Sequence, residues 1–450
     1  MRVLLRPRIR NGAPTLVTSC TSLPPEGALR LRPGKAGSAA PAGEEGAPTF
    51  VTSCTSLSPG KAGLAWGGQA RRLAGWRVVK ILIVKLSSLG DVVHTLPGVQ
   101  DIRAARPGAQ IDWVVEKSFA PLLSPLLAPG AGLHRVIPCE LRRWRKSFWT
   151  AATRAEWRAF KMQLQADHYD AVIDLQGLTK SAVVARLARL SATGQRYALA
   201  NQTEGSGYEA PTRLVADVAI AVEPHIHAMQ RSRQLCARAL GYALPPTLNY
   251  GLKTALTHIE RAQSAPETIA FVHGSSRADK QWPVEHWIAL GRLLNTLGYR
   301  IALPHGSADE LARCQLIAAE LNGDMEGTEP DAGPPQGELR PLVGQRSTRS
   351  DKREGAIIWP RLSLDALTQQ LAQCAGVIGV DSGLSHIAVA LDLPHVQIYN
   401  FDTAWRTGPL AHASADRQVS VYAQPTPTVQ AVWDAWLGCW PAGAEQRTAA

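Results

Sequence analysis

The sequence predicts an α/β protein with two parallel sheets, and three observations lead to that prediction. The chain has 450 residues, of which 45% are hydrophobic and 19% charged, enough for large cores in more than one domain. Short β-branched runs alternate along it with stretches of helical periodicity. This alternation occurs in two series, separated near residues 245–266 by loops that contain proline. Two similar halves, each with helices on both faces of its sheet, are therefore expected.

The first series starts at Val79, where the sequence changes to VKILIVKLSSLGD, a buried strand followed by a Ser/Gly loop. A helix is predicted over Thr153–Gln165, because Trp157, Phe160 and Leu164 share one face. We assign this first domain to residues 79–250. Its predicted strands are Ile81–Val84, Ile111–Val115, Arg135–Ile137 and Ala171–Asp174.

The second series forms a predicted second domain over residues 251–425, and an amphipathic helix and tail follow at 426–450. Residues 324–355 are rich in proline, glycine and charge, which predicts a mobile surface insertion without chemistry. The predicted helices of this series are Val284–Thr296, Asp309–Leu321, Leu364–Cys374 and Thr428–Leu437. Its predicted strands are Thr268–Val272, Ile301–Pro304, Ala356–Trp359, Gly376–Val380 and His395–Ile398.

Residues 1–78 differ from the rest in composition and in repetition. The motif GAPTLVTSCTSL at 12–23 returns as GAPTFVTSCTSL at 46–57, and apolar periodicity is too sparse to offset chain entropy. We expect this head to be disordered. Our hypothesis is that Val79 is the native start and that the head is mistranslated upstream sequence or a dispensable tail. A peptide from residues 1–70 in natively expressed protein, found by mass spectrometry, would contradict it.

Net charge is +11, but the head carries 11 basic and 3 acidic residues, against 37 and 34 in the rest. The body is thus close to neutral and lacks the basic stripe of a nucleic-acid-binding surface. Seven single cysteines without metal-ligand spacing predict neither a disulfide framework nor a structural metal. No apolar run approaches membrane-spanning length, so we expect a soluble protein of a reducing cytoplasm.

The loop KLSSLGD (85–91) links the first strand to a helix expected from near Val92. Ligands of open α/β sheets bind beyond the carboxyl ends of the strands, which is where this loop lies. A carboxylate at a helix N-terminus is favoured as the anion, so Asp91 could accept a proton. It could equally be a helix cap, and the loop alone does not separate these roles. Gly90 permits close backbone approach, but neither GxGxxG nor a Walker loop is present.

The loop HGSSRADKQWP (273–283) opens the second half in the same way. Ser275 and Ser276 offer hydroxyls and free N–H groups, and Lys280 adds an ammonium, which together suit a diphosphate. The alternative is a solvated lysine in a linker. Glu310, after a further strand-end loop, is another candidate, although a first-turn glutamate more often complements the helix dipole.

The segment GVDSGLSH (379–386) runs from a buried strand into a helix. Ser382 and Gly383 would present unpaired N–H groups to an anion, and Asp381 could accept hydrogen bonds from sugar hydroxyls. His386 lies within the helix and is expected to fix loop geometry rather than act in catalysis. In the first half, RRWRK (142–146) is the densest basic cluster of the body; such runs are usually solvated faces, but a polyanionic substrate is plausible.

The chain contains four motifs in this order: KLSSLGDVVHTLP (85–97), IDLQGLTKSA (173–182), HGSSRADKQWP (273–283) and GVDSGLSHIAVAL (379–391). Together they resemble the lipopolysaccharide heptosyltransferases, most closely those of type I, over about residues 79–440. The resemblance implies a GT-B fold, in which two Rossmann-like domains face each other across a cleft. It also implies inverting, metal-independent transfer of L-glycero-D-manno-heptose from ADP-heptose to the first Kdo sugar of Kdo-lipid A, without a cofactor.

The resemblance further implies a role for each matching residue. Asp91 would be the base, Lys280 would neutralise the diphosphate, Glu310 would hold the ribose and Asp381 the heptose. The other donor-side residues are Ser275, Ser276, Ser382, Gly383, Leu384 and His386, and the acceptor-side residues are Ser88, Gly90, Gln176, Arg142, Arg143, Arg145 and Lys146. The loop NFDTAWRTGP (400–409) departs from the GPTD-like loop of many relatives. We expect a monomer on the cytoplasmic face of the inner membrane, where basic residues attract anionic lipid.

Two other functions are compatible with these motifs. A heptosyltransferase of type II would act on a different core sugar, and the HTLP segment and the basic cluster argue against it. A sugar-nucleotide-binding or nucleic-acid-binding protein without catalysis would show no transfer at all. Asp91→Ala separates an enzyme from a binder, because it should abolish turnover and leave ADP-heptose binding intact.

Overall fold

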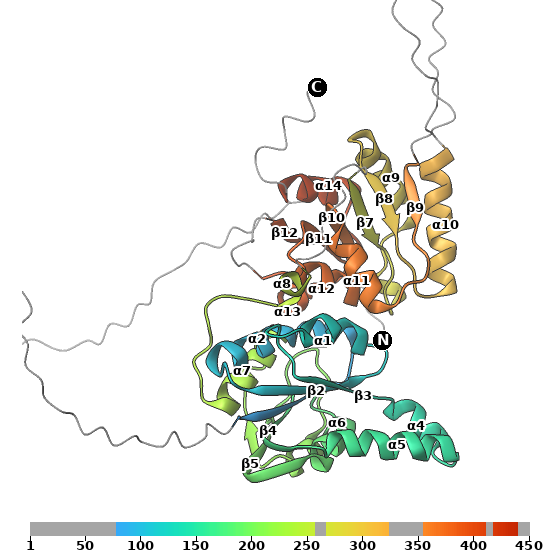
Figure 1. Ribbon diagram of the computed structural model, residues 1–450. Coiled ribbons are helices and arrows are strands. Elements are labelled where there is room, and N and C mark those ends of the chain that lie inside the picture. The colour runs from blue at the N-terminus through green and yellow to red at the C-terminus, as the bar shows by residue number, and fades with distance from the viewer. Residues whose placement is uncertain (1–77, 257–266, 324–353, 411–416, 440–450) are drawn as a thin grey trace, which may run out of the picture. The chain divides into compact units, whose positions relative to one another are not determined.

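The computed structural model describes residues 78–256, 267–323, 354–410 and 417–439. Predictions for the head before residue 78, and for most of the insertion at 324–355, lie outside these residues. The described chain forms two sheets of six strands, and every strand pair in both is parallel (Figure 1). Together with the helices between the strands, this confirms the predicted α/β class with two parallel sheets.

The first sheet has the strand order β3-β2-β1-β4-β5-β6. Its central strand, β1, is buried from Ile81 to Val84, as its β-branched run predicts. The strands are β1 Lys80–Val84, β2 Gln110–Glu116, β3 Arg135–Cys139, β4 His168–Asp174, β5 Arg189–Leu199 and β6 Val218–Ile220. The helices are α1 Leu89–Val93, α2 Leu96–Ala105, α3 Ala120–Leu123, α4 Leu141–Ser147, α5 Ala151–Leu164, α6 Thr179–Leu187, α7 Ala228–Leu240 and α8 Leu252–Ala255.

The second sheet has the order β12-β11-β10-β7-β8-β9. Its core is rich in aromatic residues, including Phe271, Trp282, Trp287 and Trp436. The strands are β7 Thr268–Val272, β8 Arg300–Leu303, β9 Ala356–Ile358, β10 Gly376–Val380, β11 His395–Tyr399 and β12 Gln418–Tyr422. The helices are α9 Val284–Thr296, α10 Ala308–Gly323, α11 Leu364–Ala372, α12 Gly383–Ala390, α13 Ala404–Thr407 and α14 Val429–Gly438.

The strands that the sequence did not predict are β5, β6 and β12. The residues of β5, RLSATGQRYAL, are largely polar and half-exposed, so they show no apolar run. They adopt the extended form because β4 pairs with them, with an irregularity between Tyr169 and Ala171. In these strands tertiary pairing decides the backbone where local propensity does not.

One hydrophobic cluster contains residues of both halves, among them Val92 of α1, Leu123 of α3, Leu371 of α11 and Ile387 of α12. The helices that follow β1 and β10 therefore meet along apolar side chains. Because α1 and α12 each begin at the carboxyl end of a central strand, this packing brings the two strand-end loops together. The predicted domain limits remain a prediction, although the change of sheet falls between β6 and β7.

Candidate active site

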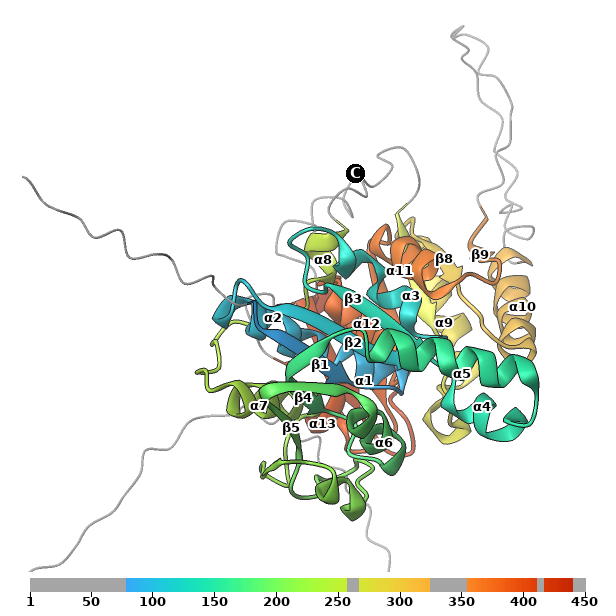
Figure 2. The same cartoon turned by 60° about the horizontal axis from the view of Figure 1, so that its bottom comes forward.

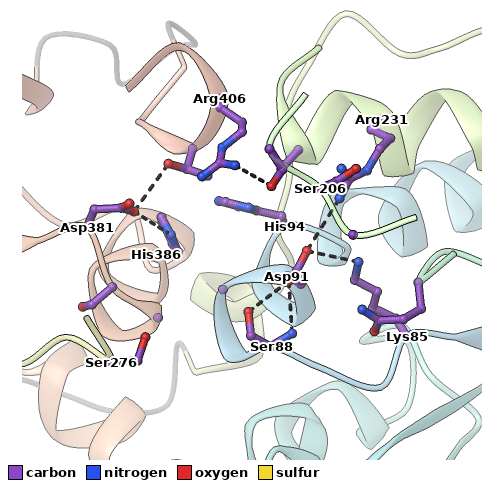
Figure 3. Close-up of a pocket in the computed structure, with 18 of the residues that line it drawn as sticks. Lys85, Ser88, Asp91, His94, Ser206, Arg231, Ser276, Asp381, His386 and Arg406 are labelled. Atoms are coloured by element: carbon purple, nitrogen blue, oxygen red, sulfur yellow. Dashed lines mark hydrogen bonds and ion pairs between the residues drawn. The ribbon is translucent and has the colours of Figure 1, made fainter. Parts of the chain in front are cut away.

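Two adjoining cavities lie where the ends of β1 and β10 meet. The first has a volume of about 300 Å³ and the second about 340 Å³. Figure 3 shows the first cavity, with side chains of both halves pointing into it. The wall that the cavities share is formed by Ser88, Gly90, Ser276, Lys280, Asp381, Ser382 and Gly383. Asp91, Gln176 and His386 line only the first cavity, and Ser275, Glu310 and Leu384 only the second.

Asp91 occupies the third position of α1, which begins at Leu89 rather than near the expected Val92. The backbone N–H and the hydroxyl of Ser88 donate to Asp91 Oδ2 at 3.0 and 2.9 Å. Asp91 therefore closes the helix N-terminus, as one of the two predicted roles requires. Its side chain is also 32% exposed and lines the first cavity, as the other predicted role, that of a base, requires.

Two cations lie behind the other oxygen of Asp91. Lys85 Nζ is 3.1 Å and Arg231 NH2 3.6 Å from Asp91 Oδ1 (Figure 3). Burial alone would raise the pKa of Asp91, but Lys85, the N–H of Ser88 and Arg231 hold it well below its usual range. Burial lowers the pKa of Lys85, and Asp91 opposes that shift. The result is a carboxylate that stays ionised at the edge of the cavity.

Asp381 is the corresponding carboxylate of the second half, at the end of β10. Lys280 Nζ lies 2.5 Å from its Oδ2, and His386 Nε2 3.5 Å from its Oδ1. The hydroxyl of Thr407 also donates to Oδ1, at 3.4 Å. Burial would raise the pKa of Asp381, but His386 and Lys280 together outweigh it and hold the pKa well below its usual range. Lys280 thus belongs to a paired site and is not a solvated linker lysine.

The second cavity contains Glu310 at the start of α10. Glu310 Oε2 accepts hydrogen bonds from the N–H groups of Gly306 and Ser307 at 2.6 and 3.2 Å. It therefore has the first-turn role that the sequence analysis weighed, while its carboxylate also lines the cavity. Nearby, the buried hydroxyl of Ser382 has no hydrogen-bond partner among the described residues, at the start of α12.

His386 packs between the two halves. Its ring centroid lies 4.3 Å from that of His94, and a Cβ at position 90 would lie 2.6 Å from His386 Cδ2. Gly90 is thus required for the approach of this imidazole to α1. His386 thus packs between the halves, and its predicted place among the donor-side residues stays a prediction.

The basic cluster lies on α4, and none of Arg142, Arg143, Arg145 and Lys146 lines either cavity. Arg143 pairs with Glu140 and Glu156, while the aromatic residue of the cluster, Trp144, is buried against Trp157 and Phe160. Assignment of the four basic residues to the acceptor remains a prediction.

Sequence analysis missed several residues of the first cavity: Lys85, His94, Ser206, Arg231, Arg406 and Thr407. Lys85 ends a buried strand, a pattern that could have identified it, since a fully buried lysine needs a partner. Arg231 and Arg406 lie more than 130 residues from Asp91 along the chain, in segments without a distinctive local pattern.

Within the described ranges, no three His, Cys, Asp or Glu side chains gather as a metal site. None of the helices described is both long and apolar enough to cross a membrane.

Comparison with known proteins places the chain in a family. The model of glycosyltransferase family 9 (heptosyltransferase) matches residues 157–327 and 343–434. The chain belongs to this family. It is 37% identical over 324 residues to lipopolysaccharide heptosyltransferase 1 of Escherichia coli K12, covering 71% of this chain and 88% of that protein. It is 35% identical over 328 residues to the enzyme of that name from Pseudomonas aeruginosa PAO1, covering 71% of this chain and 78% of that protein.

Solved structures agree. E. coli heptosyltransferase WaaC with ADP superposes with a TM-score of 0.64 at 33% identity, covering 79% of this chain and 98% of that one. E. coli ADP-heptose heptosyltransferase II gives 0.57 at 22% identity, covering 80% and 98%, which supports the fold alone. The protein is therefore a glycosyltransferase of GT-B fold, and the resemblance predicted from the four motifs is confirmed.

Proposed function

We propose that this glycosyltransferase moves L-glycero-D-manno-heptose from ADP-heptose to the first Kdo of Kdo-lipid A, with inversion and without a metal ion. The observation that carries the proposal is that Asp91 of one half and the Lys280–Asp381 pair of the other line the same cavity. A base and a diphosphate-binding cation thus border one space, as an in-line displacement requires.

The second cavity suits the donor nucleotide. The hydroxyls of Ser275 and Ser276, the free N–H groups at the start of α12 and Lys280 suit a diphosphate on the wall that the two cavities share. Lys280 would neutralise the charge that grows on the leaving ADP, which a divalent ion does in other transferases. Glu310 would meet the ribose, and Asp381 the heptose hydroxyls.

The first cavity suits the acceptor. The attacking hydroxyl of Kdo would approach the exposed side of Asp91, because Lys85, Arg231 and Ser88 occupy its other sides. The low pKa of Asp91 keeps it ionised, and the carboxylate takes the proton as the bond to the anomeric carbon forms. Ser88, Gly90 and Gln176 border the same space.

The choice of Kdo over another core sugar rests on the relatives. Identity is 35–37% to the type 1 enzymes of E. coli and P. aeruginosa, and 26% to the E. coli type 2 enzyme. The type 2 reaction is therefore the second candidate. A binder without catalysis is disfavoured, because the chain belongs to a transferase family and has a carboxylate poised in the cavity.

We also propose that helices α4 and α5 contact the cytoplasmic leaflet that holds the lipid acceptor. Figure 2 shows these two helices side by side. Trp149, between them, is 85% exposed, and Met162 on α5 is 74% exposed. Seven basic residues and two acidic ones lie in residues 140–165. Exposed aromatic residues among basic ones suit an anionic bilayer surface, at about 1 kcal/mol for each cation near it.

The test is transfer by the purified full-length protein. ADP-heptose and Kdo-lipid A should give a product heavier by one heptosyl group, with the anomeric configuration inverted, and EDTA should not stop the reaction. Lipid A without Kdo should remain unchanged. If heptosyl-Kdo-lipid A reacts and Kdo-lipid A does not, the type 2 reaction replaces the one proposed.

A further inference from the structure

Two arginines that belong to none of the four motifs line the first cavity from opposite halves. Arg231 lies on α7, and its NH1 donates to Thr203 Oγ1 at 2.9 Å. Arg406 lies on α13 of the second half, and its NH1 donates to Gly205 O at 2.5 Å. Figure 3 shows both guanidinium groups near His94, at the side of the cavity away from Ser276.

The charges around this cavity do not balance. Its cations are Lys85, Arg231, Lys280 and Arg406, and its carboxylates are Asp91 and Asp381. Lys280 and Asp381 neutralise each other, so the surplus lies with Lys85 and Arg231 around Asp91, and with Arg406. Within the described part of the chain, Arg406 forms no ion pair with a carboxylate, and its buried Nε has no hydrogen-bond partner.

The two arginines act on each other through their charges. Burial lowers the pKa of Arg231, Asp91 opposes this, and Arg406 lowers it further. An anion between two guanidinium groups would relieve this repulsion, and a planar carboxylate matches their geometry.

The position of Arg406 is fixed by contacts with the first half. Gly205 has φ of +64°, and a Cβ there would lie 1.7 Å from Arg406 NH1. On either side of Arg406, Trp405 stacks on His225 at 3.7 Å, and Gly408 O accepts from His227 Nε2 at 2.9 Å. The segment is thus held in place before substrate binds, which lowers the entropic cost of binding an anion there.

We propose that Arg231 and Arg406 form an anion subsite that binds the carboxylate of an acidic acceptor sugar, beside the hydroxyl that Asp91 deprotonates. The inference rests on the proposed function and names the acceptor chemistry of the same site. The donor diphosphate is the less favoured occupant, because both arginines line the first cavity only, whereas Lys280 and Ser276 lie on the wall shared with the second.

The experiment compares Arg406→Gln with wild type on two acceptors, Kdo-lipid A and its carboxamide analogue. Loss of a charged hydrogen bond to the carboxylate should raise the acceptor KM roughly 10- to 100-fold with the acid and leave the carboxamide nearly unaffected. Arg406→Lys should recover part of the loss, and the Kd of ADP should not change. His225→Ala is the matched control, because it removes a neighbouring contact of the segment and retains the charge.

Equal losses on both acceptors, or the same loss in His225→Ala, would show that Arg406 only holds the segment and would overturn the subsite. Weaker ADP binding would assign Arg406 to the donor instead.

Binding of free Kdo, followed by saturation-transfer NMR, needs no turnover. If wild type transfers no heptose but binds Kdo in an Arg406-dependent way, the proposed function fails and the subsite stands. If both proteins bind Kdo equally, the subsite fails.

Discussion

Asp91 and Asp381 occupy related places in the two halves, each just beyond a central parallel strand, yet their surroundings differ. The side chain of Asp91 is 32% exposed, and that of Asp381 only 6%. The cations of Asp91, Lys85 and Arg231, are themselves buried, while the lysine paired with Asp381 is 19% exposed.

This difference separates the chemistry of the halves. Asp91 presents a carboxylate to the cavity with its counter-charges behind it, which suits removal of a proton. At the other strand end it is the cation, Lys280, that is more exposed, which suits binding of an anion. In the mechanism we propose, similar topology therefore supplies a base from one half and a phosphate-binding group from the other.

The largest expected effect comes from Asp91. Asp91→Asn keeps the shape of the side chain but cannot take a proton, so kcat should fall roughly 10²- to 10⁴-fold. Isothermal titration with ADP should give an unchanged Kd, because the proposed ADP site is formed by the second half. A variant with near-normal kcat would remove Asp91 from the role of base.

Lys280→Ala should act on the other half. Loss of the ammonium should weaken ADP binding and reduce kcat/KM, each by roughly 10- to 100-fold, since a charged hydrogen bond contributes about 1.5–3 kcal/mol. Titration and steady-state kinetics measure the two effects separately. Lys280→Arg, which retains the charge, is the control. Unaltered ADP affinity in the alanine variant would contradict the diphosphate assignment.

Lys85→Met tests the charge behind Asp91. Lys85 is fully buried and also donates to Leu175 O at 3.0 Å, so methionine fills its volume but removes a cation and a donor. Without that cation, burial should raise the pKa of Asp91. Because the base must be deprotonated to act, the loss of activity on acidification should begin at a higher pH than in wild type.

The measurement is the pH profile of kcat/KM, whose acid limb should move to higher pH than in wild type. Thermal unfolding of the same variant measures its loss of stability, which should be about 1–3 kcal/mol because the carbonyl of Leu175 is left without a donor. An acid limb that coincides with that of wild type would show that Lys85 is structural only.

The smallest effect concerns His227, where the halves meet. Its Nε2 donates to Gly408 O, its Nδ1 accepts from Met229 N–H, and burial lowers its pKa from 6.5 to about 4. Between these values the unfolded chain binds a proton that the folded chain does not, so stability should fall as pH decreases from 6.5 to 4. The slope from one histidine is at most about 1.4 kcal/mol per pH unit.

His227→Gln should make this slope shallower, as measured by urea denaturation at several pH values. Above pH 7 the difference in stability between the two proteins should not change with pH, because the imidazole is neutral in the folded and the unfolded state there. An equal slope below pH 6.5 would show that other groups control the acid sensitivity.

Most of the fold could be predicted from the local pattern of apolar residues in the sequence. Runs such as Ile81–Val84 and Gly376–Val380 are buried on both faces in a parallel sheet and are therefore apolar throughout, which reveals them without a partner. The polar strand β5 was not readable, because its extended form depends on pairing with β4. The strand-end loops with Asp91, Lys280 and Asp381 were found because their sequences run directly from strand to helix.

By itself, the sequence determined which loops line the cavities, since a parallel sheet collects its strand ends at one edge and each loop keeps its motif within a few residues. Only the tertiary structure decided which side chains join them. Arg231 and Arg406 reach the cavity from segments far apart in the chain, while the basic residues of α4 line neither cavity. The physical reason is that burial and charge compensation depend on neighbours in space, which the spacing of residues along a chain does not record.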